Sequence, residues 1–219
     1  VAPEIVYGVA DYTGDSYGLS KDAMNTEADT IVFAAVKFMG ETAKLLSPQK
    51  EVLIPGRDSG CTLADAITAE QVYALRETYP EHAFICYINT TAEVKAACDV
   101  SVTSSNVYDI VERYPNDKIV FVPDFLMGQN IIAEMKERGV NKEIVLFDGN
   151  CYAHKEYEPE MIDFLKSKHA GLEVVSHPEC TIEVTAKSDF VGSTGQMMDY
   201  IKESDQNDFL LLTECGLSS

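Results

Sequence analysis

The sequence predicts an α/β protein made of three similar domains, each with a parallel sheet. Short apolar runs alternate with helical stretches along all 219 residues, which is typical of parallel strands joined by crossover helices. A phrase with small hydroxyl residues also recurs three times, as GDS at residues 14–16, TSSN at 103–106 and GSTG at 192–195. Copies roughly 90 residues apart are too far apart for solenoid units and indicate repeated domains.

The copies share more than this phrase. Asp99 precedes the second copy and Asp189 the third, and helical runs then start at Val107 and Met197. Later in each copy comes a buried-looking strand that ends in a polar turn, at residues 51–55, 118–123 and 209–214. Free backbone N–H groups at a helix start bind anions. Three such starts around one centre would hold a small molecule with several negative groups.

The predicted elements follow in order along the chain. Apolar runs predict strands over residues 31–36, 52–54, 84–88, 119–122, 144–147, 174–175 and 209–212. Helical stretches between them include residues 68–79 and 129–138, and Gly139 ends the second of these. Ligands of parallel sheets bind beyond the carboxyl ends of the strands. The residues that directly follow each strand are therefore the candidate site residues.

Composition excludes several classes of partner. A net charge of -19 argues against nucleic acid and anionic membranes, and no apolar run has transmembrane length. The six cysteines are widely spaced without a CxxC pair, so we expect reduced thiols in the cytoplasm. The chain starts at Val1 without methionine and stops abruptly at Ser219, and we expect it to be a fragment.

Two cysteines lie in corresponding strand-end loops. Cys61 and Cys151 are each close to a glycine that lets the backbone approach a cofactor. The alternative for any cysteine is a small buried hydrophobe, and we expect Cys86 and Cys98 to be of that kind.

Other strand-end residues carry acid, imidazole, phenol and amide groups, namely Tyr87, Asn89, His154, His177 and Glu179. Each also has a structural interpretation. The tyrosine suits a core, the asparagine a turn, and the histidines internal hydrogen bonds. The glutamate after Pro178 suits a helix start, and the hydroxyls of the recurring phrase suit ordinary N-caps.

Seven motifs occur in the order that quinolinate synthases share: ADYTGDS (10–16), FMGETAK (38–44), GCTLAD (60–65), YINTTAEVK (87–95), VTSSN (102–106), HPEC (177–180) and GST (192–194). Essentially the whole chain resembles this family of iron–sulfur enzymes of de novo NAD biosynthesis. The resemblance implies three αβα sandwich domains in a pseudo-threefold arrangement with the active site at their junction. We place them at residues 1–75, 76–160 and 161–219, the first without its N-terminal strand and the third without its C-terminal part.

The resemblance also implies a [4Fe-4S] cluster held by one cysteine from each domain. Cys61 and Cys151 match the first two ligands, and the third is expected beyond residue 219. Cys180 belongs to the HPEC turn, and Cys215 stands where the family does not normally have cysteine, so neither is expected to be the third ligand. The iron without a protein ligand would act as a Lewis acid. We expect the 219-residue chain alone to be inactive.

The family reaction condenses iminoaspartate with dihydroxyacetone phosphate to give quinolinate, phosphate and water. Glu179 matches the catalytic acid/base and His177 the neighbouring catalytic-site histidine. The resemblance assigns substrate contacts to Tyr87, Asn89, Ser16, Ser104 and Thr194, the last three at helix starts. His154 and Glu156 are expected to support the site. L-aspartate oxidase or aspartate dehydrogenase would supply the iminoaspartate. The family's histidine and tyrosine on the first strand, upstream of Pro3, are absent here, and the acid/base partner of Glu179 is expected there.

Two other functions remain open. A zinc hydrolase could use Cys151, His154, His177 and Glu179, although their spacing is not a recognised zinc motif. A non-catalytic module could instead capture a dicarboxylate or phosphate with three helix ends. Such capture would survive replacement of both strand-end cysteines by serine.

Overall fold

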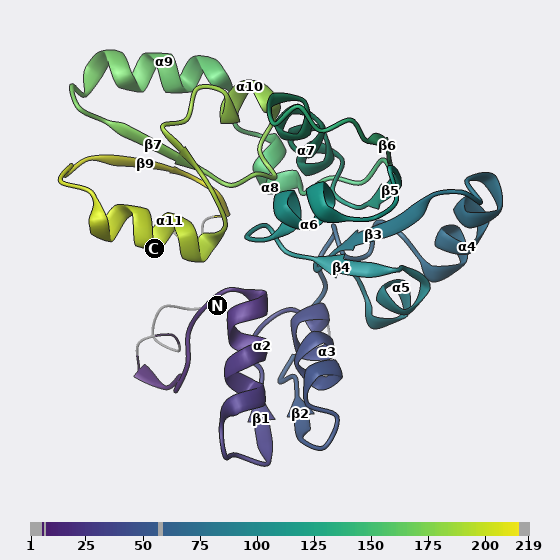
Figure 1. The fold of residues 1–219 in the computed structure, drawn as a ribbon. Helices are drawn as coiled ribbons and strands as arrows, with labels where there is room; N and C mark the ends of the chain where they lie inside the picture. The colour runs from purple at the N-terminus through teal and green to yellow at the C-terminus, as the bar shows by residue number, and fades with distance from the viewer. Residues whose placement is uncertain (1–5, 7, 57–58, 215–219) are drawn as a thin grey trace.

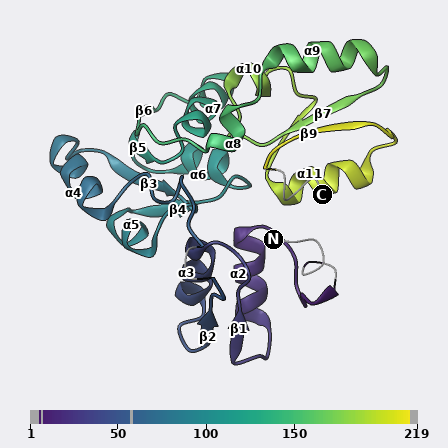
Figure 2. The same ribbon diagram turned by 180° about the vertical axis from the view of Figure 1, so that it is seen from behind.

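The structure is a computed structural model that describes residue 6, residues 8–56 and residues 59–214. In that part the strands form three separate sheets, and every strand pairing is parallel. Figure 1 shows each sheet with its own helices as a distinct group, and the groups are equally distinct from behind (Figure 2). The predicted α/β class with parallel sheets is confirmed, whereas the domain boundaries stay predictions.

The N-terminal group has two strands and two helices: β1 (Thr30–Val32), β2 (Glu51–Leu53), α2 (Ser16–Asn25) and α3 (Lys37–Leu46). Its sheet is covered on one face, where Ile31 and Val52 pack against the helices, while Val32 and Leu53 are exposed. The predicted buried strand over residues 31–36 is therefore wrong in length and burial. Apolar residue types alone do not tell whether one face of a strand or both are covered.

The middle group is the largest: β3 (Ala83–Tyr87), β4 (Val100–Val102), β5 (Lys118–Val122), β6 (Glu143–Leu146), α4 (Ala69–Thr78), α5 (Ala92–Ala97), α6 (Val107–Arg113) and α7 (Phe125–Glu137). Its strand order is β4-β3-β5-β6. Ile85 and Phe121 face α6 and α7 on one side, and Phe84 and Val120 face α4 and α5 on the other. Helices on both faces make this an αβα sandwich.

The C-terminal group has the strand order β8-β7-β9. Its elements are β7 (Glu173–Ser176), β8 (Phe190–Val191), β9 (Phe209–Leu212), α9 (Pro159–Lys168), α10 (Ile182–Thr185) and α11 (Thr194–Glu203). Ile162, Val174, Val184 and Leu212 form its core. A short helix, α8 (Tyr152–Lys155), lies where the middle and C-terminal groups meet (Figures 1 and 2).

The second and third copies of the recurring phrase use their aspartates in the same way. The backbone N–H of Phe84 donates to Asp99 Oδ2 (2.7 Å), and that of Val174 donates to Asp189 Oδ2 (2.8 Å). Asp99 directly precedes β4 and bonds to β3, and Asp189 directly precedes β8 and bonds to β7. Each aspartate thus joins the start of its own strand to the neighbouring strand of the sheet. In the first copy the described residues show no strand before α2, so the predicted strand-to-helix turn holds for two copies.

Most other predicted elements match closely. β3, β5, β6 and α4 start and end within one residue of the prediction, and Gly139, at a φ of 71°, follows α7 in the left-handed region that favours glycine. α7 starts four residues before the predicted residue 129, because Asp124 caps it. Among the described helices, none has the length and apolar character needed to cross a bilayer.

The unequal covering of the sheets predicts unequal costs for the same substitution. Val120 in β5 is 1% exposed and Val32 in β1 is 65% exposed. We expect Val120→Ala to lower the free energy of unfolding by about 2 kcal/mol, since it leaves a cavity between sheet and helices. Val32→Ala should cost about 0.5 kcal/mol or less. Urea denaturation followed by circular dichroism measures both, and equal costs would contradict the one-sided cover of β1.

Candidate functional site

A polar centre surrounds Glu179, beyond the carboxyl ends of strands from the middle and C-terminal sheets. Glu179 follows β7 and is only 3% exposed. The Tyr87 hydroxyl, at the end of β3, donates to Glu179 Oε1 over 2.8 Å. His154 in α8 brings its Nδ1 to 3.2 Å from Glu179 Oε2. One carboxylate of the C-terminal group is thus held by a side chain of β3 in the middle sheet and by a side chain of α8, which follows that sheet in the sequence.

His154 also connects to the end of β9. Its Nε2 lies 3.1 Å from Thr213 Oγ1, while the Tyr157 hydroxyl donates to the Thr213 carbonyl. The His154 ring is 5.0 Å from that of His177, centroid to centroid. The prediction gave His154 only a supporting place, whereas the structure puts it against the carboxylate.

His177 is bound differently from His154. The backbone N–H of Glu179 donates to His177 Nδ1 over 3.3 Å, so this nitrogen carries no proton. Burial lowers the pKa of His177 to about 4. The 3.5 Å approach of Nδ1 to Glu179 Oε1 is therefore the contact of a neutral imidazole and does not make an ion pair.

Glu179 and His154 carry opposite charges, the first negative and the second positive. Burial by itself would raise the pKa of Glu179, but the hydrogen bond and charge of His154 and the hydroxyl of Tyr87 outweigh it and lower the pKa to about 2. Burial likewise opposes protonation of His154, yet Cys151 and Glu179 raise its pKa to about 10. Burial and the nearby carboxylate raise the pKa of Tyr87 well above its usual value. The centre therefore holds an anion, a cation and a neutral phenol.

Asp124 is a second buried carboxyl beside this centre. It caps α7 through the backbone N–H of Met127 (2.9 Å) and accepts the backbone N–H of Cys151 (2.8 Å). Burial, followed by the charge of Glu179, raises the pKa of Asp124 to about 7. Asp124 thus ties the loop that carries Cys151 to the end of β5.

The two strand-end thiols lie against one core. Cys61 and Cys151 are half-buried and pack on the same apolar cluster of the middle sheet. Burial raises the pKa of Cys61, the backbone N–H groups of Ala64 and Leu63 oppose this, and the charges of Glu179 and Cys151 add to it. A thiol that faces backbone N–H groups, as Cys61 does, fits an iron–sulfur cluster.

Cys151 also belongs to a second group of possible metal ligands. One atom each of Cys151, His154 and Glu179 lie within 4.8 Å of one another, a mixed set that also suits zinc. Cys215 lies outside the described residues.

The hydroxyl and amide residues predicted to contact substrate have fewer bonds to the Glu179 centre than Tyr87 and His154 have. The Ser104 side chain lies close enough to the Tyr87 hydroxyl to oppose the rise of its pKa. Ser16 and Thr194 occupy the first positions of α2 and α11, whose starts adjoin, since a Cβ added at Gly195 would lie 3.4 Å from Asp15 Oδ2. Asn89 follows β3 and is half-buried. The roles predicted for all these residues stay predictions.

The sequence prediction missed Asp124, Asn130 and Thr213. Asp124 is the second residue after β5 and Thr213 directly follows β9, so the strand-end rule already covered them. Asn130 lies inside α7, where nothing in the sequence distinguishes it.

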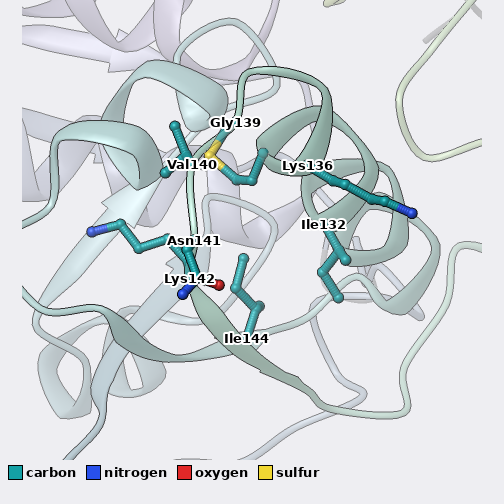
Figure 3. A pocket seen from close by; sticks show the side chains of 8 residues that line it. Ile132, Lys136, Gly139, Val140, Asn141, Lys142 and Ile144 are labelled. Carbon is teal, nitrogen blue, oxygen red and sulfur yellow. The ribbon is translucent and has the colours of Figure 1, made fainter.

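A surface pocket of about 250 Å³ lies elsewhere, between α7 and β6 (Figure 3). Ile132, Val140 and Ile144 line it, and Lys142 turns its Nζ to the Tyr114 carbonyl (2.7 Å). None of the predicted site residues lines this pocket, so it is not the candidate site.

The fold and the site define an α/β protein whose site lies beyond the carboxyl ends of its parallel strands. The groups gathered there are an acid, two histidines and two thiols. The family model described as Quinolinate synthetase A protein matches residues 1–219. The chain belongs to this family.

The similar curated proteins have matching names. Quinolinate synthase 2 of Mesorhizobium japonicum is 46% identical over 99% of this chain, and the quinolinate synthases of Caldicellulosiruptor bescii and Xylella fastidiosa are 44% and 43% identical over 97% and 99%. The chain spans about two thirds of these relatives' own lengths, at 65%, 69% and 62%. A solved (E)-4-hydroxy-3-methyl-but-2-enyl diphosphate reductase aligns with 93% of this chain and 90% of its own, at 9% identity and a TM-score of 0.33, too low for any conclusion.

The depressed pKa of His177 predicts acid sensitivity. Its folded pKa of about 4 lies below the unfolded value near 6.5, so between these values the unfolded chain binds one more proton. The contribution of His177 to stability should then be lost as the pH falls through this window, by about 1.4 kcal/mol per pH unit. The raised pKa of Asp124 acts in the opposite direction, so the contribution is measured as the difference in slope between variants with and without His177. His177→Gln should remove that slope, and exposed His169→Gln should keep it. Urea titrations of the protein without metal between pH 4 and 7 measure it, and equal slopes in both variants would contradict the assignment.

Proposed function

We propose that the chain carries the catalytic centre of a quinolinate synthase, which condenses iminoaspartate with dihydroxyacetone phosphate to quinolinate, phosphate and water. The observation that carries the proposal is the buried Glu179 carboxylate, hydrogen-bonded by Tyr87 and paired with His154 beside Cys151. Family membership supplies the substrates. An L-aspartate oxidase or aspartate dehydrogenase would provide iminoaspartate, and the reduced thiols suit a cytoplasmic enzyme.

The proposed cofactor is a [4Fe-4S] cluster held by Cys61, Cys151 and a third cysteine outside residues 1–219. The shared core under both thiols and the backbone N–H groups at Cys61 support this. When bound, such a cluster supplies Lewis-acid chemistry at an iron without a protein ligand.

The charge states suggest which residue accepts a proton and which one donates it. Glu179 is ionised across the physiological range, so it enters the reaction as a proton acceptor at Oε1 or Oε2. His154, with a pKa of about 10, starts as the protonated partner and can donate from Nδ1. Neutral His177 is free to orient substrate through Nε2.

The remaining predicted residues would hold the negative groups of the substrates. Ser104 lies next to the Tyr87 hydroxyl, where the serine hydroxyl can donate to a carboxylate. Ser16 and Thr194 sit at the adjoining starts of α2 and α11, where backbone N–H groups favour phosphate or carboxylate. Asn89, at the end of β3, would add an amide donor.

The zinc alternative is favoured by one observation, the mixed set of Cys151, His154 and Glu179. Metal analysis of the anaerobically purified full-length protein decides between the two. Iron and inorganic sulfide in nearly equal amounts support the synthase, and zinc without sulfide supports the hydrolase.

Replacing either proposed ligand should remove the cluster. We expect Cys61→Ser and Cys151→Ser, made in the full-length protein, to lose iron, sulfide and quinolinate formation, because a serine hydroxyl is a poor ligand for iron in a thiolate site. Cys98→Ser is the matched control, since Cys98 is half-buried on a different core cluster. Full iron content in either ligand variant would contradict the assignment. Phosphate or dicarboxylate binding that survives both, without activity in the parent, would favour the binding module.

Glu179→Gln should separate the chemistry from the cluster. The amide keeps the size of the side chain but takes no proton, so kcat should fall by about 10²–10⁴ with iron content unchanged. Glu183→Gln, exposed in the neighbouring helix α10, should keep the parent rate. Anaerobic quinolinate formation measures both, and a Glu179→Gln enzyme with the parent kcat would refute the proton-transfer role.

A further inference from the structure

Asn130 is a buried polar side chain that the proposed chemistry does not use. It lies in α7 and is 7% exposed. Its Nδ2 donates to the carbonyl oxygens of Pro178 and Cys180, each over 2.9 Å. These two residues flank Glu179, so one amide group from the middle group grips the backbone on both sides of the carboxylate that anchors the site.

The orientation of this amide is itself fixed. The Thr185 hydroxyl donates to Asn130 Oδ1 over 2.8 Å, which directs the oxygen toward α10 and both N–H groups toward the turn. Both donors and one acceptor position of the amide are therefore used, and rotation of the amide would break all three bonds.

The other bonds of the turn attach it to its own sheet. The backbone N–H of Cys180 donates to the His177 carbonyl (3.0 Å), and the Cys180 thiol lies 3.4 Å from the Leu212 carbonyl in β9. Neither bond fixes the turn relative to Tyr87, which belongs to the middle sheet. Asn130 does, because α7 packs on that same sheet.

We propose that Asn130 is a positioning residue that holds the Pro178–Cys180 turn against the middle sheet, so that the Glu179 carboxylate meets Tyr87 and His154. Its effect on turnover rests on the proposed function, because it acts through Glu179. A misplacement of about 1 Å at a reacting group can cost about 100-fold in rate, and the loss of a group that orients a catalytic residue falls in the same range.

The test is Asn130→Leu in the full-length, cluster-loaded protein. The leucine has a similar size and no donors, so the turn loses its hold on the middle sheet. We expect kcat to fall about 10- to 100-fold with KM within about threefold of the parent, and iron and sulfide content unchanged. Hydrogen exchange of the backbone amides of His177, Glu179 and Cys180 should become faster.

Two further variants separate positioning from general stability. Met135→Ala removes a buried side chain of the same helix and should lower the melting temperature without changing kcat or exchange in the turn. Thr185→Val, which frees the amide without deleting it, should lower kcat less than Asn130→Leu does. It also provides the test if the leucine variant does not fold.

The outcomes separate clearly. A kcat of Asn130→Leu within about twofold of the parent, or an equal kcat loss in Met135→Ala, overturns the proposal. If the parent protein forms no quinolinate, the proposed function fails, but the exchange comparison still decides whether Asn130 holds the turn. Unchanged exchange at His177, Glu179 and Cys180 in Asn130→Leu then overturns the positioning role.

Discussion

The buried charge of Glu179 is the constraint on which the junction of the middle and C-terminal groups depends. An unpaired carboxylate at this depth would cost several kcal/mol, and it is tolerated because Tyr87 and His154 reach it from the other side. No apolar cluster among the described residues draws from both sheets. The relative position of the two groups is therefore specified by charge and hydrogen bonds, those of Glu179 together with those of Asn130.

The same polar character extends along the junctions. Asn130 of the middle group holds the turn of Glu179 in the C-terminal group. The N-terminal group joins the middle one through Glu41, whose Oε2 accepts the backbone N–H of Ala92 over 2.8 Å. A polar junction can open and close around a charged ligand more readily than an apolar core can, because its contacts exchange with water at small net cost. Separate cores with polar seams thus suit a site for small anions.

The sequence predicts the middle sheet well and the surroundings of the site only in part. Apolar runs locate β3 and β5 because both faces of these strands are buried, whereas β1 has the same residue types and an open face. The strand-end rule finds Tyr87, Cys151 and Glu179. It does not reveal Asn130, because a helical asparagine looks the same whether it faces water or two carbonyls from a distant turn. Such contacts depend on how the groups pack, which local patterns do not contain.

The charges of the centre are the feature that sequence could least supply. His154 and His177 are the same residue type beside one carboxylate, yet one holds its proton to a pKa of about 10 and the other loses it above about 4. The difference comes from Cys151 and Glu179, which outweigh burial at His154, whereas burial and the charge of His154 outweigh Glu179 at His177. The partners that each ring meets in the interior thus decide which imidazole carries the charge. The HPEC turn therefore places the carboxylate, and its burial keeps the neighbouring histidine neutral.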